Sequence, residues 1–232
     1  MILAILFVIL CLSNGSCGNC RHSRRRAVRR KSRQGTVVPM KLLEEKILSD
    51  GIVLPGGVLK VDNFLNHQID PVIVTEMGKE FFRLFGDKKV DKIVTVESSG
   101  IAIAFAAAQY FGVPVVFAKK GFHKNVGTDV YSAQYFSFTK GDSTEISISK
   151  RLLSEGEHIL IIDDFLANGA AADALIQILQ AAGAALTGIG IAIEKGFQPG
   201  GASLRQRGVP VRSLAIIDTM TDDSITFRDD VQ

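Results

Sequence analysis

The amino-acid sequence predicts an α/β fold in which helices cover both faces of a mainly parallel, twisted β-sheet. Continuous apolar or β-branched runs, such as Lys92–Val96 and His158–Asp163, are typical of strands that are buried on both faces. Segments whose apolar residues recur every three or four positions separate these runs, as expected for amphipathic helices. The 232 residues, of which 47% are hydrophobic and 22% charged, can bury a sizeable core, which excludes a largely disordered chain.

The first 39 residues differ from the rest in composition. They hold eight basic residues, no acidic residue and all three cysteines, so residues 40–232 keep 19 of the 27 basic residues against 24 acidic ones, a formal charge of −5. The apolar run Met1–Leu12 would reach only about 18 Å as a helix, too short for a bilayer core of roughly 30 Å. We expect residues 1–39 to be a disordered or non-native extension. A tail that binds nucleic acid or anionic lipid, or a metal knuckle at Cys17 and Cys20, stays open as an alternative.

Helices and short strands alternate in the first half of the remaining region. Lys41–Leu48 has helical periodicity and ends before an Asp-Gly pair, and Pro71–Phe85 repeats this spacing over a longer stretch. Gly57–Val61, between these two segments, is a short strand candidate. The strand Lys92–Val96 leads into an alanine-rich helix, which we expect over Gly100–Tyr110.

The second half contains the longest apolar strands. Val113–Ala118 predicts another buried strand, and the polar stretch 119–130, which has no periodicity, follows it. Val130–Phe138 and Glu145–Ser149 are expected to form a hairpin-like section, and His158–Asp163 a fully apolar strand. The remaining expected elements are a helix over 170–182 and strands over 186–194 and 211–217.

The strongest chemical pattern follows the strand that starts at His158, and ligands of parallel sheets bind at such strand ends. The strand runs into Asp163 and Asp164, and the loop Ala167–Ala170 then opens a helix. Neighbouring side chains on a strand point to opposite sides, so one carboxylate can face a ligand while the other anchors the loop or a metal-bound water. Loop amides at a helix N-terminus suit a phosphate. Carboxylates for hydroxyls beside amides for a phosphate match a ribose 5-phosphate, although an acidic strand end with a glycine turn would look the same.

This segment resembles the phosphoribosyl-pyrophosphate (PRPP) motif of the type I phosphoribosyltransferases, in which four apolar residues and two acids precede a small-residue phosphate loop. Asn168 stands where threonine is common, and Ala170 and Ala171 replace a Gly-Thr pair. A hydroxyl contact to the phosphate is thereby lost, and Asn168 can donate through its side-chain amide instead.

Three further stretches, together with the PRPP motif, resemble the bacterial xanthine phosphoribosyltransferases. They are Val58–Pro71, Val94–Gly100 and Ile193–Gly200, and with them the resemblance covers about Met40 to Phe227. Separate motifs in the same order are far more specific than any one of them alone.

The resemblance implies the type I phosphoribosyltransferase fold for a domain over residues 40–232. Its core would span about 71–192. A small hood would be formed by N- and C-terminal parts, about 40–70 and 193–210.

The resemblance also implies roles for single residues. Asp163 and Asp164 would be the catalytic pair near the ribose hydroxyls, and Leu59, Asn66 and Lys195 would bind the purine. The segment from Lys119 and Lys120 to Lys140 would close over the site. The positions expected to bind PRPP are Ala167, Asn168, Gly169, Ala170 and Ala171 at the 5-phosphate, Glu97, Ser98, Ser99 and Gly100 at the pyrophosphate, and Lys119.

Several of these residues also have plain structural interpretations. Lys195 could be a solvated strand end, Asn66 a helix or turn cap, and Lys119 part of a surface pair. His67 and His123 have no partner acid in the sequence and are given structural roles. Phe165, which follows the acid pair, could pack under the sheet or stack on the purine.

The activity implied by the resemblance is transfer of the 5-phosphoribosyl group from PRPP to N9 of xanthine, giving xanthosine 5′-monophosphate and pyrophosphate in purine salvage. Mg²⁺ would be the cofactor, held mainly by PRPP without a direct protein ligand. We expect a cytoplasmic homodimer without membrane or nucleic-acid partners. An adenine or other 6-oxopurine phosphoribosyltransferase, or a PRPP-sensing transcription regulator on the same fold, stays open, whereas a Rossmann dehydrogenase is excluded because no G-x-G-x-x-G follows the first strand.

Overall fold

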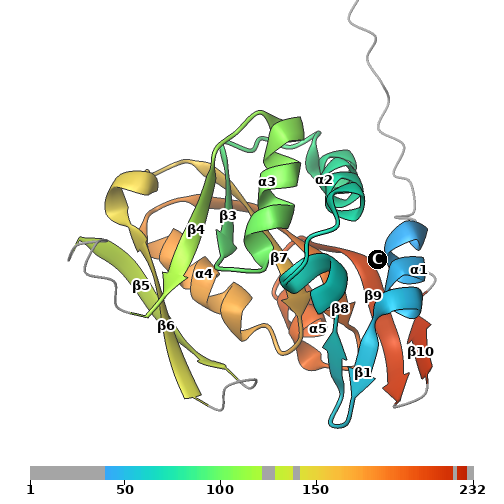
Figure 1. The fold of residues 1–232 in the computed structure, drawn as a ribbon. Coiled ribbons are helices and arrows are strands. Elements are labelled where there is room, and N and C mark those ends of the chain that lie inside the picture. Colours follow the sequence, from blue (N-terminus) through green and yellow to red (C-terminus); the bar gives the residue numbers. More distant parts are fainter. Residues whose placement is uncertain (1–39, 122–128, 138–141, 222–223, 229–232) are drawn as a thin grey trace, which may run out of the picture. The chain divides into compact units, whose positions relative to one another are not determined.

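The computed structural model describes residues 40–121, 129–137, 142–221 and 224–228 (Figure 1). All of them belong to one compact unit, Thr36–Gln232. The extension expected over residues 1–39 lies outside the described residues, as do His123 and parts of the segment expected to close over the site.

An eight-stranded sheet forms the centre of this unit. Its strands are β3 (Lys92–Val96), β4 (Val115–Lys120), β5 (Val130–Ser137), β6 (Asp142–Ser149), β7 (His158–Leu166), β8 (Ala185–Lys195), β9 (Val211–Thr221) and β10 (Ser224–Phe227). From edge to edge the order is β10-β9-β8-β7-β3-β4-β6-β5. The pairs between β9 and β4 are all parallel, whereas β10 and the β5–β6 hairpin add antiparallel edges. The predicted mainly parallel sheet is therefore confirmed.

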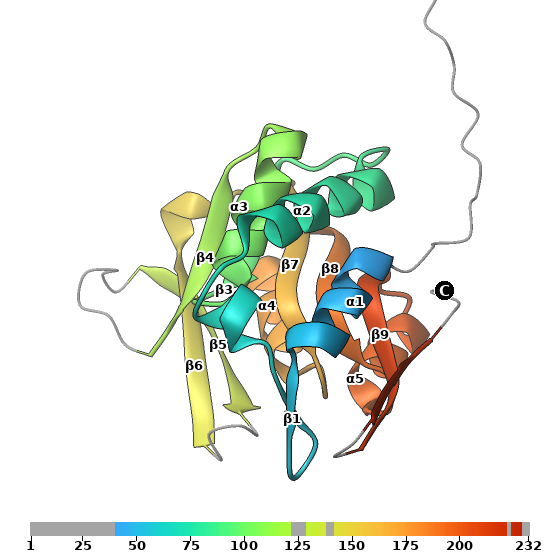
Figure 2. The ribbon, with the colours of Figure 1, turned by 45° about the vertical axis from the view of Figure 1, so that its right-hand side comes forward.

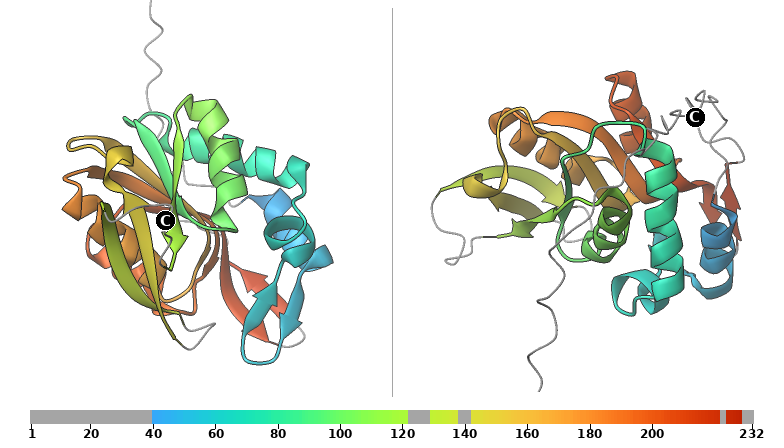
Figure 3. Two further views of the ribbon diagram at one scale, coloured as in Figure 1. Left: turned by 60° about the vertical axis from the view of Figure 1, so that its left-hand side comes forward. Right: turned by 90° about the horizontal axis from the view of Figure 1, so that it is seen from above.

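Helices cover both faces of the sheet, as the alternating pattern predicts (Figures 1 and 3). On one face lie α1 (Lys41–Asp50), α2 (Pro71–Phe85) and α3 (Gly100–Phe111). On the other face lie α4 (Ala170–Ala181) and α5 (Pro199–Gln206).

The alternation of β7 explains why this strand is a continuous apolar run in the sequence. Leu160 and Ile162 are fully buried in the cluster that contains α2 and α3. Ile159 and Ile161 are buried in the cluster that contains α4. Because both faces of the strand exclude water, no polar residue alternates with the apolar ones.

The acid pair lies inside β7, whereas the sequence analysis ends this strand at Asp163. Pairing with β8 continues to Phe165, opposite Ile193, and to Leu166, opposite Glu194. The backbone therefore stays extended for three residues beyond the predicted end, because β8 offers hydrogen-bond partners that a local sequence pattern does not reveal.

Several short elements were not predicted. β1 (Ile52–Leu54) and β2 (Val58–Lys60) form a separate two-stranded antiparallel sheet, which a π-helical turn over Asp62–Asn66 follows (Figure 2). Only the β2 strand matches an expectation, the one over Gly57–Val61. The other short elements missed are the 3₁₀ turn Lys150–Leu152, α5 and β10. Such segments are too short to show a hydrophobic period, and tertiary pairing decides their conformation.

No helix within the described ranges combines the length and the apolar character that crossing a membrane requires.

Candidate active site

Four neighbouring strands end at one edge of the sheet and bring the predicted site residues together. β3 leads into Glu97, β4 ends with Lys120, β7 carries the acid pair, and β8 ends with Lys195. Parallel strands place their carboxyl ends at the same edge. The backbone N–H of Glu97 donates to the carbonyl of Ala118 (3.1 Å), and the backbone N–H of Lys120 donates to Glu97 Oε1 (2.7 Å). The loop after β3 is thus tied to the end of β4.

The two carboxylates of the acid pair have different surroundings. Asp164 is 9% exposed, and Asp163 is only partly buried. Asp163 Oδ1 accepts a hydrogen bond from the backbone N–H of Asp164 (3.0 Å). Burial raises the pKa of Asp163 well above its usual range, the charge of Asp164 raises it further, and the charge of Lys120 acts in the opposite direction. Among the residues that the structure describes, positive charge does not offset burial and the charge of Asp164 at Asp163, which suits a ligand that brings hydroxyl donors or a cation.

Gly100 lets the loop after β3 pack directly against the acid pair. A methyl group on its Cα would lie 2.1 Å from Thr95 Oγ1 and 2.9 Å from Asp163 Oδ1. The Thr95 hydroxyl is buried without a hydrogen-bond partner among the described residues. The Glu97–Ser98 peptide bond in this loop is cis. Residues 97–100, expected to bind pyrophosphate, therefore lie beside the residues expected to hold the ribose.

We expect Gly100→Ala to weaken pyrophosphate binding by roughly 10- to 100-fold, because the methyl group must displace the loop or the side chains of Thr95 and Asp163, and one lost hydrogen bond to a charged ligand has an effect of that size. Isothermal titration calorimetry with pyrophosphate measures this loss. Gly188→Ala is the matched control. Gly188 lies on β8, away from this loop, and its added methyl group would lie 2.6 Å from Phe85 Cε1. The control should lose stability but keep its affinity for pyrophosphate. Equal affinity of the Gly100→Ala protein and the wild type would contradict the assignment of this loop.

The loop after β7, which is expected to bind the 5-phosphate, presents backbone groups at the start of a helix. Gly169 has a φ of +87°, a left-handed conformation that favours glycine, and it directly precedes α4. Asn168 Oδ1 accepts a hydrogen bond from the backbone N–H of Ala170 (3.3 Å), so its Nδ2 group is the part of the side chain that can donate to a phosphate. The loop amides lie at the N-terminus of α4, which favours an anion.

Lys195 joins the end of β8 to the β1–β2 turn. Its Nζ atom donates to the carbonyl of Gly57 (2.9 Å) and lies 6.0 Å from the centre of the Phe165 ring. Burial lowers the pKa of Lys195. The interpretation of Lys195 as a freely solvated strand end is therefore wrong. The Phe165 ring therefore lies on the same side of the sheet edge as the Lys195 ammonium.

The other two residues expected to bind the purine lie in different surroundings. Leu59 is only 6% exposed and belongs to the hydrophobic core. Asn66 is exposed at the end of the π-helical turn. It does not cap α2, because Asp70 accepts the hydrogen bonds from the first amides of that helix. The interpretation of Asn66 as a cap of this helix is therefore wrong.

A hollow of about 380 Å³ connects Asn66 with the loop after β3. Ser98 and Ser99 lie on its wall together with Asn66. Its apolar lining consists of Leu65, Ile69, Ile101, Ala102 and Phe105.

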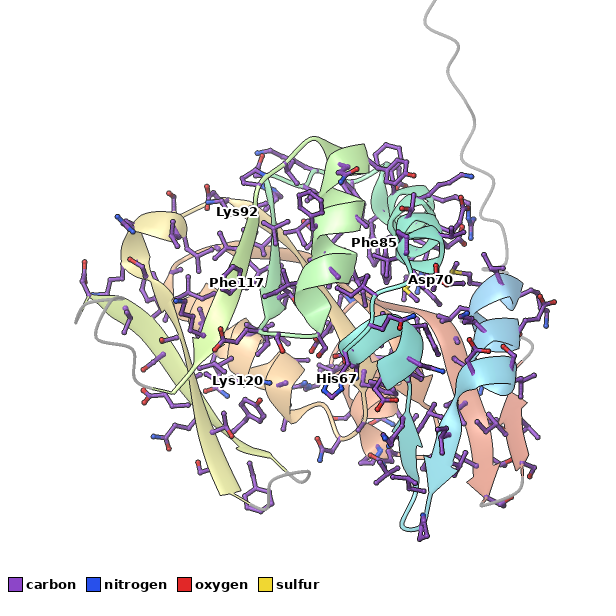
Figure 4. All side chains as sticks on the ribbon, viewed as in Figure 1. His67, Asp70, Phe85, Lys92, Phe117 and Lys120 are labelled. Carbon is purple, nitrogen blue, oxygen red and sulfur yellow. The ribbon has the colours of Figure 1, made fainter. Side chains whose placement is uncertain are left out.

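His67, which follows the π-helical turn, and Lys120, at the end of β4, both lie below α3 in the view of Figure 4.

Tyr135 is a residue of the site region that sequence reasoning missed. Burial raises its pKa and the charge of Asp163 adds to this effect, which means that the β5–β6 hairpin brings this phenol within electrostatic reach of the acid pair. The two residues lie in separate strands and no local spacing relates them, so only the tertiary structure reveals the relation.

Comparison with known proteins shows which family the site belongs to. The family model of the phosphoribosyl transferase domain matches residues 60–208. The xanthine phosphoribosyltransferase of Finegoldia magna is 53% identical over 190 residues, which cover 82% of this chain and 100% of that protein. The xanthine phosphoribosyltransferase of Bacillus cytotoxicus is 55% identical over 188 residues, covering 81% of this chain and 95% of that one.

Solved structures of adenine phosphoribosyltransferases share the fold. The Rhodothermus marinus structure has a TM-score of 0.61 at 19% identity, and covers 76% of this chain and 99% of its own. The Saccharomyces cerevisiae structure, which contains adenine, has a TM-score of 0.60 at 23% identity, and covers 75% of this chain and 99% of its own. At these identities the likeness concerns the fold, and it confirms the predicted type I phosphoribosyltransferase architecture.

Proposed function

The chain belongs to the xanthine phosphoribosyltransferase family, and we propose that it transfers the 5-phosphoribosyl group of PRPP to N9 of xanthine, forming xanthosine 5′-monophosphate and pyrophosphate in purine salvage. The observation that carries this proposal is the convergence of three groups at one sheet edge. They are the backbone phosphate loop after β7, the acid pair within β7, and the half-buried Lys195 at the end of β8. Together they suit a phosphate, a ribose and a base.

The residues divide the work of the reaction between the two ends of PRPP. The amides of Ala167–Ala171 hold the 5-phosphate, and Asp163 and Asp164 hold the ribose hydroxyls. C1 gains positive charge as its bond to pyrophosphate loosens, and the nearby carboxylates stabilise that charge. Loop amides of residues 97–100 and the Lys119 ammonium stabilise the negative charge that develops on the leaving pyrophosphate.

The magnesium ion of this chemistry fits the donors present. No group of three or more His, Cys, Asp or Glu side chains that could hold a metal occurs in the part of the chain that the structure describes. Mg²⁺ uses few protein ligands and would be held mainly by PRPP, and its charge near Asp163 and Asp164 would relieve the repulsion between these two carboxylates. When bound with PRPP, Mg²⁺ supplies charge neutralisation at the pyrophosphate, and the acid pair orients the ribose beside it.

Base choice rests on Lys195. An ammonium beside an oxo group of the base stabilises the anionic form of the purine, and xanthine is an unusually acidic purine. The anion attacks C1 without a strong protein base. The same ammonium disfavours adenine, whose exocyclic amino group donates hydrogen bonds instead of accepting them.

The test uses the full chain with PRPP and Mg²⁺ and follows pyrophosphate release with xanthine, guanine, hypoxanthine and adenine in turn. We expect release with xanthine far above the other three. Release with adenine above xanthine would contradict the base assignment and favour the adenine alternative. No release with any base, while PRPP still binds, would contradict the enzyme and favour a PRPP-sensing regulator.

The division into a core over about 71–192 and a hood over about 40–70 and 193–210 is part of this proposal. The hydrogen bond from Lys195 to Gly57 supports it, because it joins the two hood segments to each other. We propose that residues 40–232 act in the cytoplasm without a nucleic-acid partner, as the sequence analysis expects.

We also propose a homodimer, supported by large apolar side chains that the described chain leaves in water. Ile69 is 51% exposed and Phe105 is 59% exposed, and both line the hollow that contains Asn66. A second copy that covers them would remove apolar surface from water beside the site.

We expect Phe105→Asp to convert a dimer into a monomer, because a carboxylate at this surface resists burial. Sedimentation velocity measures the change. Leu152→Asp is the matched control, since Leu152 is 40% exposed in the 3₁₀ turn after β6. The control should remain dimeric. A Phe105→Asp protein that sediments as the wild type does would contradict this interface.

A further inference from the structure

A buried ion pair lies directly behind the base-side lysine. Glu194 is 2% exposed and precedes Lys195 on β8, so its side chain points to the opposite face of the strand. Arg205 of α5 donates to both Glu194 oxygens at 2.7 Å, and the Ser213 hydroxyl of β9 donates to Oε2. Burial alone would raise the pKa of Glu194, but the hydrogen bonds from Arg205 and Ser213 outweigh it and leave the pKa below its usual range.

The helix that carries Arg205 also forms the rear wall of the phosphate loop. The backbone N–H of Gly200 donates to the carbonyl of Ala167 (3.0 Å). A methyl group on Gly200 would lie 2.5 Å from that carbonyl oxygen and 2.6 Å from the backbone N of Gly169. The first turn of α5 therefore touches the phosphate loop without space for any side chain.

Close packing continues along α5 to the ion pair. A methyl group on Gly201 would lie 2.0 Å from Glu194 Oε1 and 2.7 Å from an Arg205 guanidinium nitrogen. The position of α5 is therefore set at one end by the phosphate loop and at the other by Glu194. The ion pair is the link between the two.

From these contacts we infer that Arg205 and Glu194 are positioning residues, which hold the phosphate loop in register with Lys195. The inference rests on the proposed function, because it assigns the loop to the 5-phosphate and Lys195 to the base. Neither residue touches the ligand. They act through α5 on the loop and through the β8 backbone on Lys195.

A purely structural role explains the pair less well. Replacing a buried ion pair by apolar side chains is often neutral or stabilising, so such a pair is weak evidence for a contribution to stability. Two parallel hydrogen bonds between a planar guanidinium and a carboxylate do fix both distance and orientation. That property is useful where two parts of a site must stay aligned.

The test compares Arg205→Met, Arg205→Lys and wild type in the full chain. The first measurement is ribose 5-phosphate binding by isothermal titration calorimetry, which needs no base and no catalysis. We expect Arg205→Met to raise the dissociation constant by roughly 10- to 100-fold, the effect of losing one hydrogen bond between the displaced loop and the charged phosphate. Arg205→Lys keeps the charge but not the paired hydrogen bonds, so its dissociation constant should lie between those of wild type and Arg205→Met.

The second measurement separates KM from kcat. We expect Arg205→Met to raise the KM values of both PRPP and xanthine, with a smaller fall in kcat at saturation. Arg83→Met is the matched control, because Arg83 also donates to both oxygens of a glutamate, Glu80, but on the exposed surface of α2. The control should leave both constants unchanged.

Unchanged ribose 5-phosphate binding in a folded Arg205→Met protein would overturn the inference and leave the pair a structural feature. If Arg205→Met does not fold, Ser213→Ala replaces it, since it removes one hydrogen bond to Glu194. A weaker but measurable loss of ribose 5-phosphate affinity in Ser213→Ala then supports the inference, and wild-type affinity overturns it.

Failure of the proposed function and failure of the role of Arg205 give different experimental results. A wild-type chain that binds ribose 5-phosphate but releases no pyrophosphate with xanthine contradicts the proposed function alone, and the Arg205 comparison still applies. A wild-type chain that does not bind ribose 5-phosphate overturns both.

Discussion

Replacing Lys195 by alanine is expected to reduce xanthine turnover by roughly 100- to 1000-fold, the effect of removing one preorganised donor from a transition state. Affinity for PRPP should stay close to that of the wild type, because Lys195 contacts the β1–β2 turn and Phe165 and lies on the base side of the proposed site. Steady-state kinetics with xanthine and calorimetry with PRPP separate the two effects.

The pH profile gives a second test of the same residue. Burial lowers the pKa of Lys195, so the ammonium loses its proton at a lower pH than an exposed lysine does. Turnover of xanthine should therefore fall as pH rises through this lowered pKa. The lysine-to-alanine protein should lack this alkaline limb.

Lys60→Ala is the control for the Lys195 experiment. Lys60 lies on β2, the same small sheet, but its Nζ atom pairs with Asp62 Oδ2 at 3.0 Å, and its side chain is 43% exposed. Loss of this surface pair should leave turnover unchanged. Full xanthine turnover in the Lys195→Ala protein would refute the role of Lys195.

Asp163→Asn is expected to have opposite effects on activity and stability. Turnover should fall by at least about 100-fold, because the amide cannot supply negative charge near C1 of PRPP. The free energy of unfolding of the ligand-free protein should rise by about 1 kcal/mol at neutral pH, because the substitution removes a carboxylate that burial and Asp164 destabilise. Chemical denaturation and steady-state kinetics measure the two effects.

The stability effect of Asp163→Asn should depend on pH with a defined sign. The pKa of Asp163 is raised in the folded state, so its contribution to stability is fully present below the unfolded-state pKa and is lost as pH rises through the folded-state pKa. Wild type and variant should therefore be equally stable in acid and differ most at neutral pH and above.

Asp91→Asn is the matched control for this pH dependence. The pKa of Asp91 is lowered, chiefly because its carboxylate accepts a hydrogen bond from the backbone N–H of His158 (2.9 Å). This substitution should leave stability unchanged or reduce it at neutral pH. A gain in stability from Asp91→Asn, or a loss from Asp163→Asn, would contradict the electrostatic explanation.

Much of the fold follows from local patterns. The helix over Pro71–Phe85 and the strand over Lys92–Val96 have the predicted bounds in the structure. Both show a strong signal, since the helix has apolar spacing over four turns and the strand is buried on both faces. By contrast, β1, α5 and β10 hold three, eight and four residues, and their sequences carry no period by which to recognise them.

The candidate site divides in the same way. Motifs that are continuous in sequence predict the acid pair, the phosphate loop and the loop over residues 97–100, because each of these forms within one strand end and the turn after it. Lys195 and Asn66 are predicted only as separate positions. The interpretation of Lys195 as a solvated strand end is wrong because its hydrogen-bond partner, Gly57, lies in a distant segment. The interpretation of Asn66 as a helix cap is wrong because Asp70 accepts the hydrogen bonds from the first amides of α2.

The sequence by itself determined the fold class, the family and the residues at the strand ends, because hydrophobic periodicity and short motifs are local properties of the chain. Only the tertiary structure decided that Gly100 packs on Asp163, that Tyr135 lies within electrostatic reach of that carboxylate, and that the helix of Arg205 contacts both the loop after β7 and Glu194 on the strand of Lys195. These relations join residues that are distant along the chain. Burial, charge repulsion and close packing act through space, so they exist only once the sheet has assembled.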